Sequence, residues 1–231
     1  MTEHTVKSYG EELAHLTAEV TRMGGIAESQ VADCIAAIAR RDGPLAQAVV
    51  AGDERLDALQ GEIERKAFRL IALRQPMAVD LRHAVAALKI SMSLERCGDM
   101  AKNIGKRALI LNDADPMTAL TRSIERMGKL VQGRLKDVLD AYTGSDLDRA
   151  MAVWSRDDEV DEHYNSLFRE LLTYMMGDPR TITACAHLLF VAKNLERIGD
   201  HATNIAEIIH YEITGEEMIS ADRPKTDALS A

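Results

Sequence analysis

Two short stretches of this sequence carry carboxylates at a spacing that could bind metal ions. LERCGDMAKNI (94–104) and LERIGDHATNI (195–205) lie 101 residues apart and are identical at eight of eleven positions. Residues four apart on an α-helix are offset by only about 40° around its axis, so they share one face. Each stretch therefore presents a stripe of oxygen ligands: Glu95, Asp99 and Asn103 in the first, and Glu196, Asp200 and Asn204 in the second.

A glycine lies between the two acids of each stripe, Gly98 in the first and Gly199 in the second. Two acids four residues apart repel one another, and a glycine inside a helix costs about 1 kcal/mol relative to alanine. Something must offset both penalties. A missing side chain lets a bulky bound cluster or a neighbouring backbone approach closely, and tight helix packing alone is the simpler alternative.

Each stripe is preceded by a second pair of acids at the same spacing, in DERLD (53–57) and DDEVD (157–161). In an antiparallel helical hairpin, residues equally far from the turn lie side by side. The midpoints between the early and late acids fall at position 76, in RQPM, and between positions 178 and 179, in GDPR; both stretches are turn signals. The sequence therefore predicts that each hairpin brings four carboxylates to one level. The additional acids are Asp53 and Asp57 in the first half, and Asp157 and Asp161 in the second.

Four carboxylates at one level cannot all stay ionised without cations or large pKa shifts. Cations are the simpler solution, and oxygen ligands suit divalent or trivalent ions such as magnesium, manganese, calcium or iron; zinc is also considered. The alternative is a solvated charged face, in which Arg96 and Arg197 form salt bridges to the acids.

The elements that must position these acids are predicted to be helices throughout. Aromatic residues make up only 4% of the 231 residues, and residues that favour helix over strand are plentiful. Helical periodicity predicts an all-α fold of two tandem three-helix bundles, residues 1–112 and 113–213, followed by a flexible tail at 214–231. The six predicted helices are Val6–Arg41, Pro44–Leu73, Met77–Leu111, Pro116–Tyr142, Ser145–Met176 and Arg180–Tyr211.

Composition excludes several classes of function. The formal net charge is −9, no basic stripe suggests nucleic-acid binding, and no apolar run approaches the roughly 18 residues of a membrane span, so we expect a cytoplasmic protein without membrane insertion. The three cysteines lack metal or disulfide spacing and are expected to be buried apolar residues. Walker A, GxGxxG, GxSxG and HExxH motifs are absent, so we expect no enzyme.

At ERCGD, ERIGD, DERLD and DDEVD the chain resembles the PhoU family of phosphate-signalling regulators. The resemblance extends from the first helix to about Tyr211. It implies two three-helix bundles with metal clusters at these motifs. It also implies an adaptor between the ATPase subunit of a phosphate ABC transporter and a phosphate-sensing histidine kinase, which represses phosphate-starvation genes when phosphate is plentiful. A homodimer is expected.

The chain departs from the family pattern at three positions, which predicts that its first site differs from its second. Ser93 and Asn194 stand where the family commonly has an acid before LER, and Cys97 replaces an isoleucine. Two alternative functions remain open: a PhoU-like regulator of a different phosphate transporter, and a carboxylate-bridged, metal-dependent phosphohydrolase.

Overall fold

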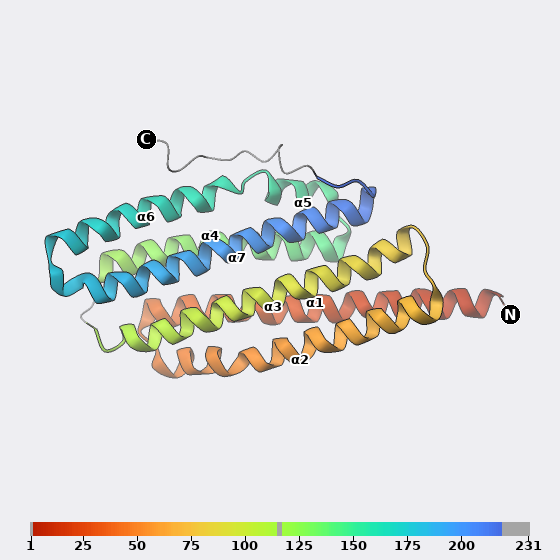
Figure 1. Ribbon diagram of the computed structural model, residues 1–231, viewed down its shortest axis with the longest axis horizontal. Helices are drawn as coiled ribbons and strands as arrows, with labels where there is room; N and C mark the ends of the chain where they lie inside the picture. Colours follow the sequence, from red (N-terminus) through yellow and green to blue (C-terminus); the bar gives the residue numbers. More distant parts are fainter. Residues whose placement is uncertain (1, 115–116, 219–231) are drawn as a thin grey trace.

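Two sets of long helices lie side by side in the computed structural model, which describes residues 2–114 and 117–218 (Figure 1). The described residues form helices and turns and no strand, so the predicted all-α fold is confirmed. The first set comprises α1 (Thr2–Arg40), α2 (Gly43–Arg74) and α3 (Val79–Leu111). The second comprises α4 (Thr118–Gly144), α5 (Leu147–Trp154), α6 (Asp158–Gly177), the short 3-10 helix η1 (Pro179–Thr181) and α7 (Ile182–Thr214).

The two sets share one apolar core. In the middle of the molecule α3 lies along α7, and α1 packs against α4, while α2 and α6 lie on opposite outer sides (Figure 1). Fully buried side chains such as Leu16, Leu94 and Leu135 come from both sets and belong to one continuous cluster. Cys34, Cys97 and Cys185 are buried within it as free thiols, as predicted.

The contact between α1 and α4 repeats with approximate twofold symmetry. A Cβ atom added to Gly24 of α1 would lie 2.6 Å from Leu139 of α4, and one added to Gly128 of α4 would lie 2.7 Å from Ile35 of α1. A single shift of 104 residues relates the two contacts, since it takes Gly24 to Gly128 and Ile35 to Leu139. These two glycines therefore allow the close approach of the helices, and the shift identifies equivalent positions on α1 and α4.

The two hairpin turns lie at the positions predicted from the midpoints between the acids. Residues 75–78 separate α2 from α3, and Asp178 with η1 separates α6 from α7. At the start of α2, Pro44 occupies the first turn and the backbone N–H of Leu45 donates to Asp42 Oδ1 (2.9 Å). Pro116 and most of the predicted tail, 219–231, lie outside the described residues.

The fifth predicted helix, Ser145–Met176, is interrupted. Helix α5 ends at Trp154 and α6 begins at Asp158, with a turn between them. Arg134 of α4 donates to the backbone carbonyls of Val153 (3.0 Å) and Arg156 (2.5 Å), which at the break accept only the longer bonds from the N–H groups of Arg156 and Glu159, three residues on. A buried arginine thus stabilises the break, which periodicity alone did not reveal. Within the described part of the chain, no helix is apolar over enough residues to span a bilayer.

Candidate metal centre

Three carboxylates from two helices of the second half converge on one point. Asp161 lies near the start of α6, and Glu196 and Asp200 lie one turn apart on α7; one oxygen of each lies within 4.8 Å of the others. Metal–oxygen distances are about 2.0–2.6 Å for magnesium and calcium, so oxygens this close can ligate a single ion. Among the residues that the structure describes, these three are the His, Cys, Asp or Glu side chains that lie close enough together to share an ion. We call them the second-half site.

One carboxylate oxygen of Glu196 has no hydrogen-bond donor. Its Oε1 atom accepts a hydrogen bond from Lys193 (2.6 Å), whereas its Oε2 atom is buried without a hydrogen-bond partner. Lys193 is half exposed and also lies over the Tyr164 ring, 5.2 Å from its centre. A buried carboxylate oxygen without a donor is unfavourable, and a bound cation removes that penalty. The donor set therefore fits a hard metal ion.

Asp157, predicted to share this site, forms a different set of contacts. Its Oδ1 atom accepts hydrogen bonds from Thr203 (2.6 Å) and from Arg134 (3.3 Å). Arg134 also donates to Thr203 (2.9 Å) and is only 3% exposed. Asp157 is thus held by a buried guanidinium that comes from a third helix. Arg134 was missed by the sequence analysis, although an arginine at an otherwise apolar position of an amphipathic helix was a usable signal.

The two asparagines of the stripes have different surroundings. Asn204 lines a pocket of about 250 Å³ between α3 and α7, together with Lys89 and Tyr211. Asn103 is exposed on α3. Each asparagine is eight residues from the glutamate of its stripe, so the offset of about 40° per four residues has accumulated to about 80°. Their role as metal ligands remains a prediction.

In the first half, a lysine is placed among the acids. Lys102 of α3 donates to Asp53 of α2 in a short hydrogen bond and to Asp99 Oδ1 at 3.2 Å. Asp53 is 3% exposed, and its Oδ1 atom is buried without a hydrogen-bond partner. These contacts raise the pKa of Lys102, with the Asp53 hydrogen bond as the largest cause, so the ammonium stays charged. An internal cation therefore balances this pair of acids.

The other two acids of the first half are close enough to affect each other. Loss of solvation is the largest cause that raises the pKa of Asp57, followed by the charge of Asp53. Burial also raises the pKa of Glu95, with Arg96 opposing this effect and Asp99 adding to it. Asp57 and Asp53 also contribute to raising the pKa of Glu95, so the four predicted acids of the first half influence one another electrostatically.

The salt-bridged alternative describes the first half better than the second. Arg96 lies 3.5 Å from both Glu95 and Asp99. Its counterpart Arg197 forms no ion pair with any residue that the structure describes. The arginine in ERCGD therefore lies within ion-pair distance of the acids of its own motif, and among the described residues the arginine in ERIGD does not.

The glycines of the two motifs serve helix packing. A Cβ atom at Gly98 would overlap Leu56 of α2, and one at Gly199 would lie 3.3 Å from Val160 of α6. The simpler of the two explanations for these glycines is therefore sufficient. The close approach that they allow also shortens the distance between α2 and α3 and between α6 and α7, whose acids face one another.

Comparison with known proteins identifies the family to which the chain belongs. The family model described as "PhoU domain" matches residues 20–108 and again residues 124–209, which together cover more than half of the chain. The chain belongs to the PhoU family. The two matches contain both copies of the acidic motif and the two preceding pairs of acids.

Relatives within the PhoU family match along the entire chain. A Caulobacter vibrioides protein named "Phosphate-specific transport system accessory protein PhoU homolog" is 90% identical over 230 residues, covering 100% of both chains. A Rhizobium meliloti protein of the same name is 47% identical, covering 98% of this chain and 95% of its own.

Solved PhoU structures share the fold. The crystal structure of PhoU from Pseudomonas aeruginosa has a TM-score of 0.88 at 36% identity, covering 90% of this chain and 100% of that chain. The Streptococcus pneumoniae regulatory protein PhoU has a TM-score of 0.85 at 27% identity, covering 91% and 99%.

Proposed function

We propose that this protein is a cytoplasmic accessory regulator of phosphate uptake that acts by binding and catalyses no reaction. It would contact the ATPase subunit of a phosphate ABC transporter and a phosphate-sensing histidine kinase, and repress starvation genes when phosphate is plentiful. The observation that carries this proposal is the match to PhoU accessory proteins over the whole chain, at up to 90% identity among the relatives named above. Long helical faces and a duplicated architecture suit a protein that contacts two partners.

We further propose that Asp161, Glu196 and Asp200 hold a metal ion that stiffens the α6–α7 hairpin. The support is the convergence of three carboxylates and the buried Glu196 oxygen that no donor satisfies. Iron, manganese, magnesium and zinc are the candidates. Bound metal would supply positive charge at a point where three acids repel, so it would stabilise the hairpin. The first half, already balanced by Lys102, would bind metal more weakly.

Metal analysis of protein purified without chelator tests the second proposal. Asp161→Asn/Asp200→Asn should remove most of the bound metal, whereas Glu95→Gln/Asp99→Asn should remove less. Glu162→Gln is the matched control, since Glu162 is an exposed acid that follows Asp161 on α6. Equal metal content in the wild type and the Asp161/Asp200 variant would exclude this site.

Deletion of the gene tests the regulatory role. In the deletion strain, starvation genes should stay active in phosphate-rich medium. In a pull-down experiment, the purified protein should retain the ATPase subunit or the kinase. We also propose that the protein is a homodimer. Normal repression in the deletion strain, with neither partner retained, would refute the role. Regulation of another phosphate transporter would then be examined, and an assay against phosphate esters would examine the phosphohydrolase alternative.

A further inference from the structure

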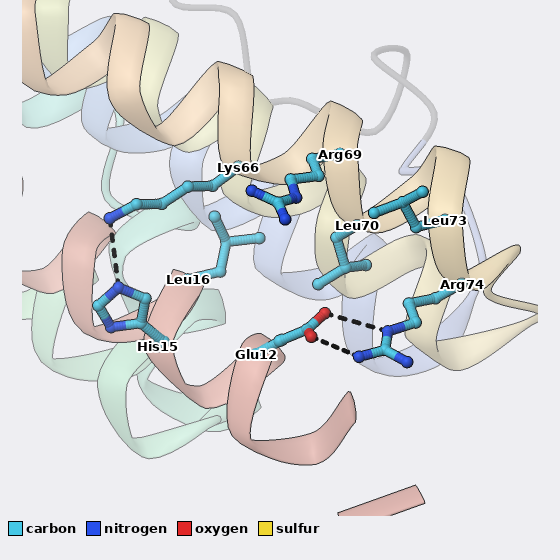
Figure 2. Close-up of a pocket in the computed structure, with 8 residues that line it drawn as sticks. All are labelled: Glu12, His15, Leu16, Lys66, Arg69, Leu70, Leu73 and Arg74. Atoms are coloured by element: carbon cyan, nitrogen blue, oxygen red, sulfur yellow. Dashed lines mark hydrogen bonds and ion pairs between the residues drawn. The ribbon is translucent and has the colours of Figure 1, made fainter. Parts of the chain in front are cut away.

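A pocket of about 450 Å³ lies between the beginning of α1 and the last turns of α2, far along the chain from the acidic motifs (Figure 2). Its volume is within the range of about 300–1,000 Å³ that is typical of small-molecule sites. Leu16 and Leu70 form an apolar base and are 1% and 4% exposed. We call this cavity the α1–α2 pocket.

Two polar bridges between the helices mark the ends of the pocket (Figure 2). At one end Arg74 of α2 donates to both carboxylate oxygens of Glu12 on α1, at 2.6 and 3.3 Å. At the other end Lys66 lies 3.2 Å from the His15 ring and 3.4 Å from Glu19. The charge of Glu12 is therefore already balanced by Arg74, whose hydrogen bond is the largest cause that lowers the pKa of Glu12.

Arg69 lies between these two bridges, and its charge contributes to lowering the pKa of Glu12, after the larger contribution of Arg74. Its side chain extends from α2 into the space above Leu16 (Figure 2). Among the residues whose side chains are described, it forms no hydrogen bond or ion pair. Leu73, one turn further along α2, also lines the pocket and is 68% exposed. A guanidinium whose N–H groups can still donate and an exposed leucine thus face the same cavity.

We propose that the α1–α2 pocket binds a small organic phosphate of about nucleotide size. Its phosphate pairs with Arg69 and Lys66, and its apolar part covers Leu70 and Leu73. Arg69 and Lys66 are three residues apart on α2 and so present their charges on one face. A phosphate carries about two negative charges and three acceptor oxygens, which can engage two separate cations, whereas a single carboxylate is better matched to one guanidinium fork.

The apolar part of the ligand follows from the base of the pocket. Inorganic phosphate would satisfy Arg69 but would leave Leu73 in water, and it would fill only a small part of the cavity. A nucleoside attached to the phosphate would remove Leu73 from water and increase affinity in proportion to the apolar area buried. The preferred ligand therefore combines both features.

Calorimetric titration of the full chain tests this proposal, with ADP as the probe and with pyrophosphate and adenosine as partial probes. All titrations contain EDTA and no divalent ion, so that ADP cannot attach through metal at the second-half site. ADP should bind more tightly than pyrophosphate, and adenosine should show no measurable binding. Equal affinity for ADP and pyrophosphate would overturn the apolar part of the proposal.

Variants in the pocket should separate the two contributions. Arg69→Ala should weaken ADP binding about tenfold to hundredfold, because a hydrogen bond to a charged group contributes about 1.5–3 kcal/mol. Leu73→Ser should weaken ADP binding while leaving pyrophosphate binding unchanged. Arg55→Ala, which removes an exposed arginine of the same helix outside the pocket, is the charge-matched control and should bind as the wild type does.

Three outcomes would overturn the proposal: no binding of ADP to folded protein, equal binding by the wild type and Arg69→Ala, or an equal loss in Arg55→Ala. Binding of an acidic peptide or of anionic phospholipid vesicles without any binding of ADP would also overturn it. The proposed adaptor role stands or falls separately, because it is tested by repression in cells.

Discussion

The two halves place the same pattern of acids in different electrostatic surroundings. In the first half, Lys102 of α3 lies between Asp53 and Asp99. Its equivalent on α7, 101 residues later, is Thr203, which cannot supply a charge. In the second half the buried cation is Arg134 of α4, whose equivalent on α1, 104 residues earlier, is Gln30.

The difference shows that a motif determines where carboxylates lie and leaves open how their charge is balanced. Arg134 pairs with Asp157 at one edge of the second-half site, so three other carboxylates remain together. In the first half, by contrast, Lys102 pairs with two of the four acids, Asp53 and Asp99. Two nearly identical motifs are therefore expected to differ in metal affinity because of one residue on a third helix and one residue within the motif.

Removal of Arg134 should give the largest effect on stability. Arg134→Met removes the charged donor of the Asp157 carboxylate and the side-chain donor of two backbone carbonyls, all at a buried position, so we expect the free energy of unfolding to fall by about 3–5 kcal/mol. Urea denaturation followed by circular dichroism, in the presence of chelator, measures this loss. Gln30→Met is the matched control at the equivalent position. Its Oε1 atom is buried without a partner, so a change within about 1 kcal/mol is expected. Similar losses in both variants would contradict the comparison.

Removal of Lys102 should make the first half resemble the second. Lys102→Met should lower the free energy of unfolding by about 2 kcal/mol in chelator, because Asp53 loses its charged donor. Added manganese should restore much of that loss, and metal content per chain should rise. Lys106→Met, an exposed lysine four residues later on α3, is the control and should change neither quantity. Unchanged metal content in Lys102→Met would show that the lysine does not exclude metal.

The two motif glycines should respond unequally to alanine. Gly98→Ala places a methyl group against Leu56, and overpacking of about 1–3 kcal/mol should exceed the gain of about 1 kcal/mol in helix propensity. A net loss of roughly 1 kcal/mol is expected. Gly199→Ala meets Val160 at 3.3 Å, so its two effects should nearly cancel. Melting temperatures of both variants measure the difference. A larger drop in melting temperature for Gly199→Ala than for Gly98→Ala would contradict the prediction that Gly98 is the more tightly packed of the two.

The helical hairpins could be predicted from the sequence because the evidence for them is local. Spacing of four within a helix, turn residues at the midpoints and repetition of the motif are all properties of short segments, and the structure confirms the turns at 75–78 and at Asp178. The same reasoning paired Asp161 with Glu196 and Asp157 with Asp200, and in the structure Asp161, Glu196 and Asp200 lie together. Carboxylates that face one another across a hairpin are thus accessible to sequence analysis.

The charge balance could not be predicted because it depends on long side chains from other helices. Nothing near Asp157 in the sequence indicates that Arg134 approaches it, since that contact depends on how α4 packs against α5 and α6, between which Asp157 lies. Similarly, Lys102 lies within the first copy of the repeated motif, but the sequence does not show that the Lys102 ammonium lies between Asp53 and Asp99. That contact depends on where the neighbouring helix α2 places Asp53. Tertiary placement, rather than periodicity, determines both contacts.

The smallest expected effect concerns a contact that joins the two halves. His83 of α3 lies 2.5 Å from Glu212 of α7 and 2.7 Å from the Thr17 hydroxyl of α1. The hydrogen bond with Glu212 is the largest cause that raises the pKa of His83; burial opposes it, and the charges of Glu212 and Asp80 add to it. A histidine whose pKa is raised in the folded state stabilises the fold below its ordinary pKa of about 6.5, and this contribution is lost as the pH rises through the folded pKa. The wild type should therefore lose more stability than His83→Gln between about pH 6 and pH 8.5 in urea denaturation. If both proteins show the same change with pH, the His83–Glu212 pair does not stabilise the contact between the halves.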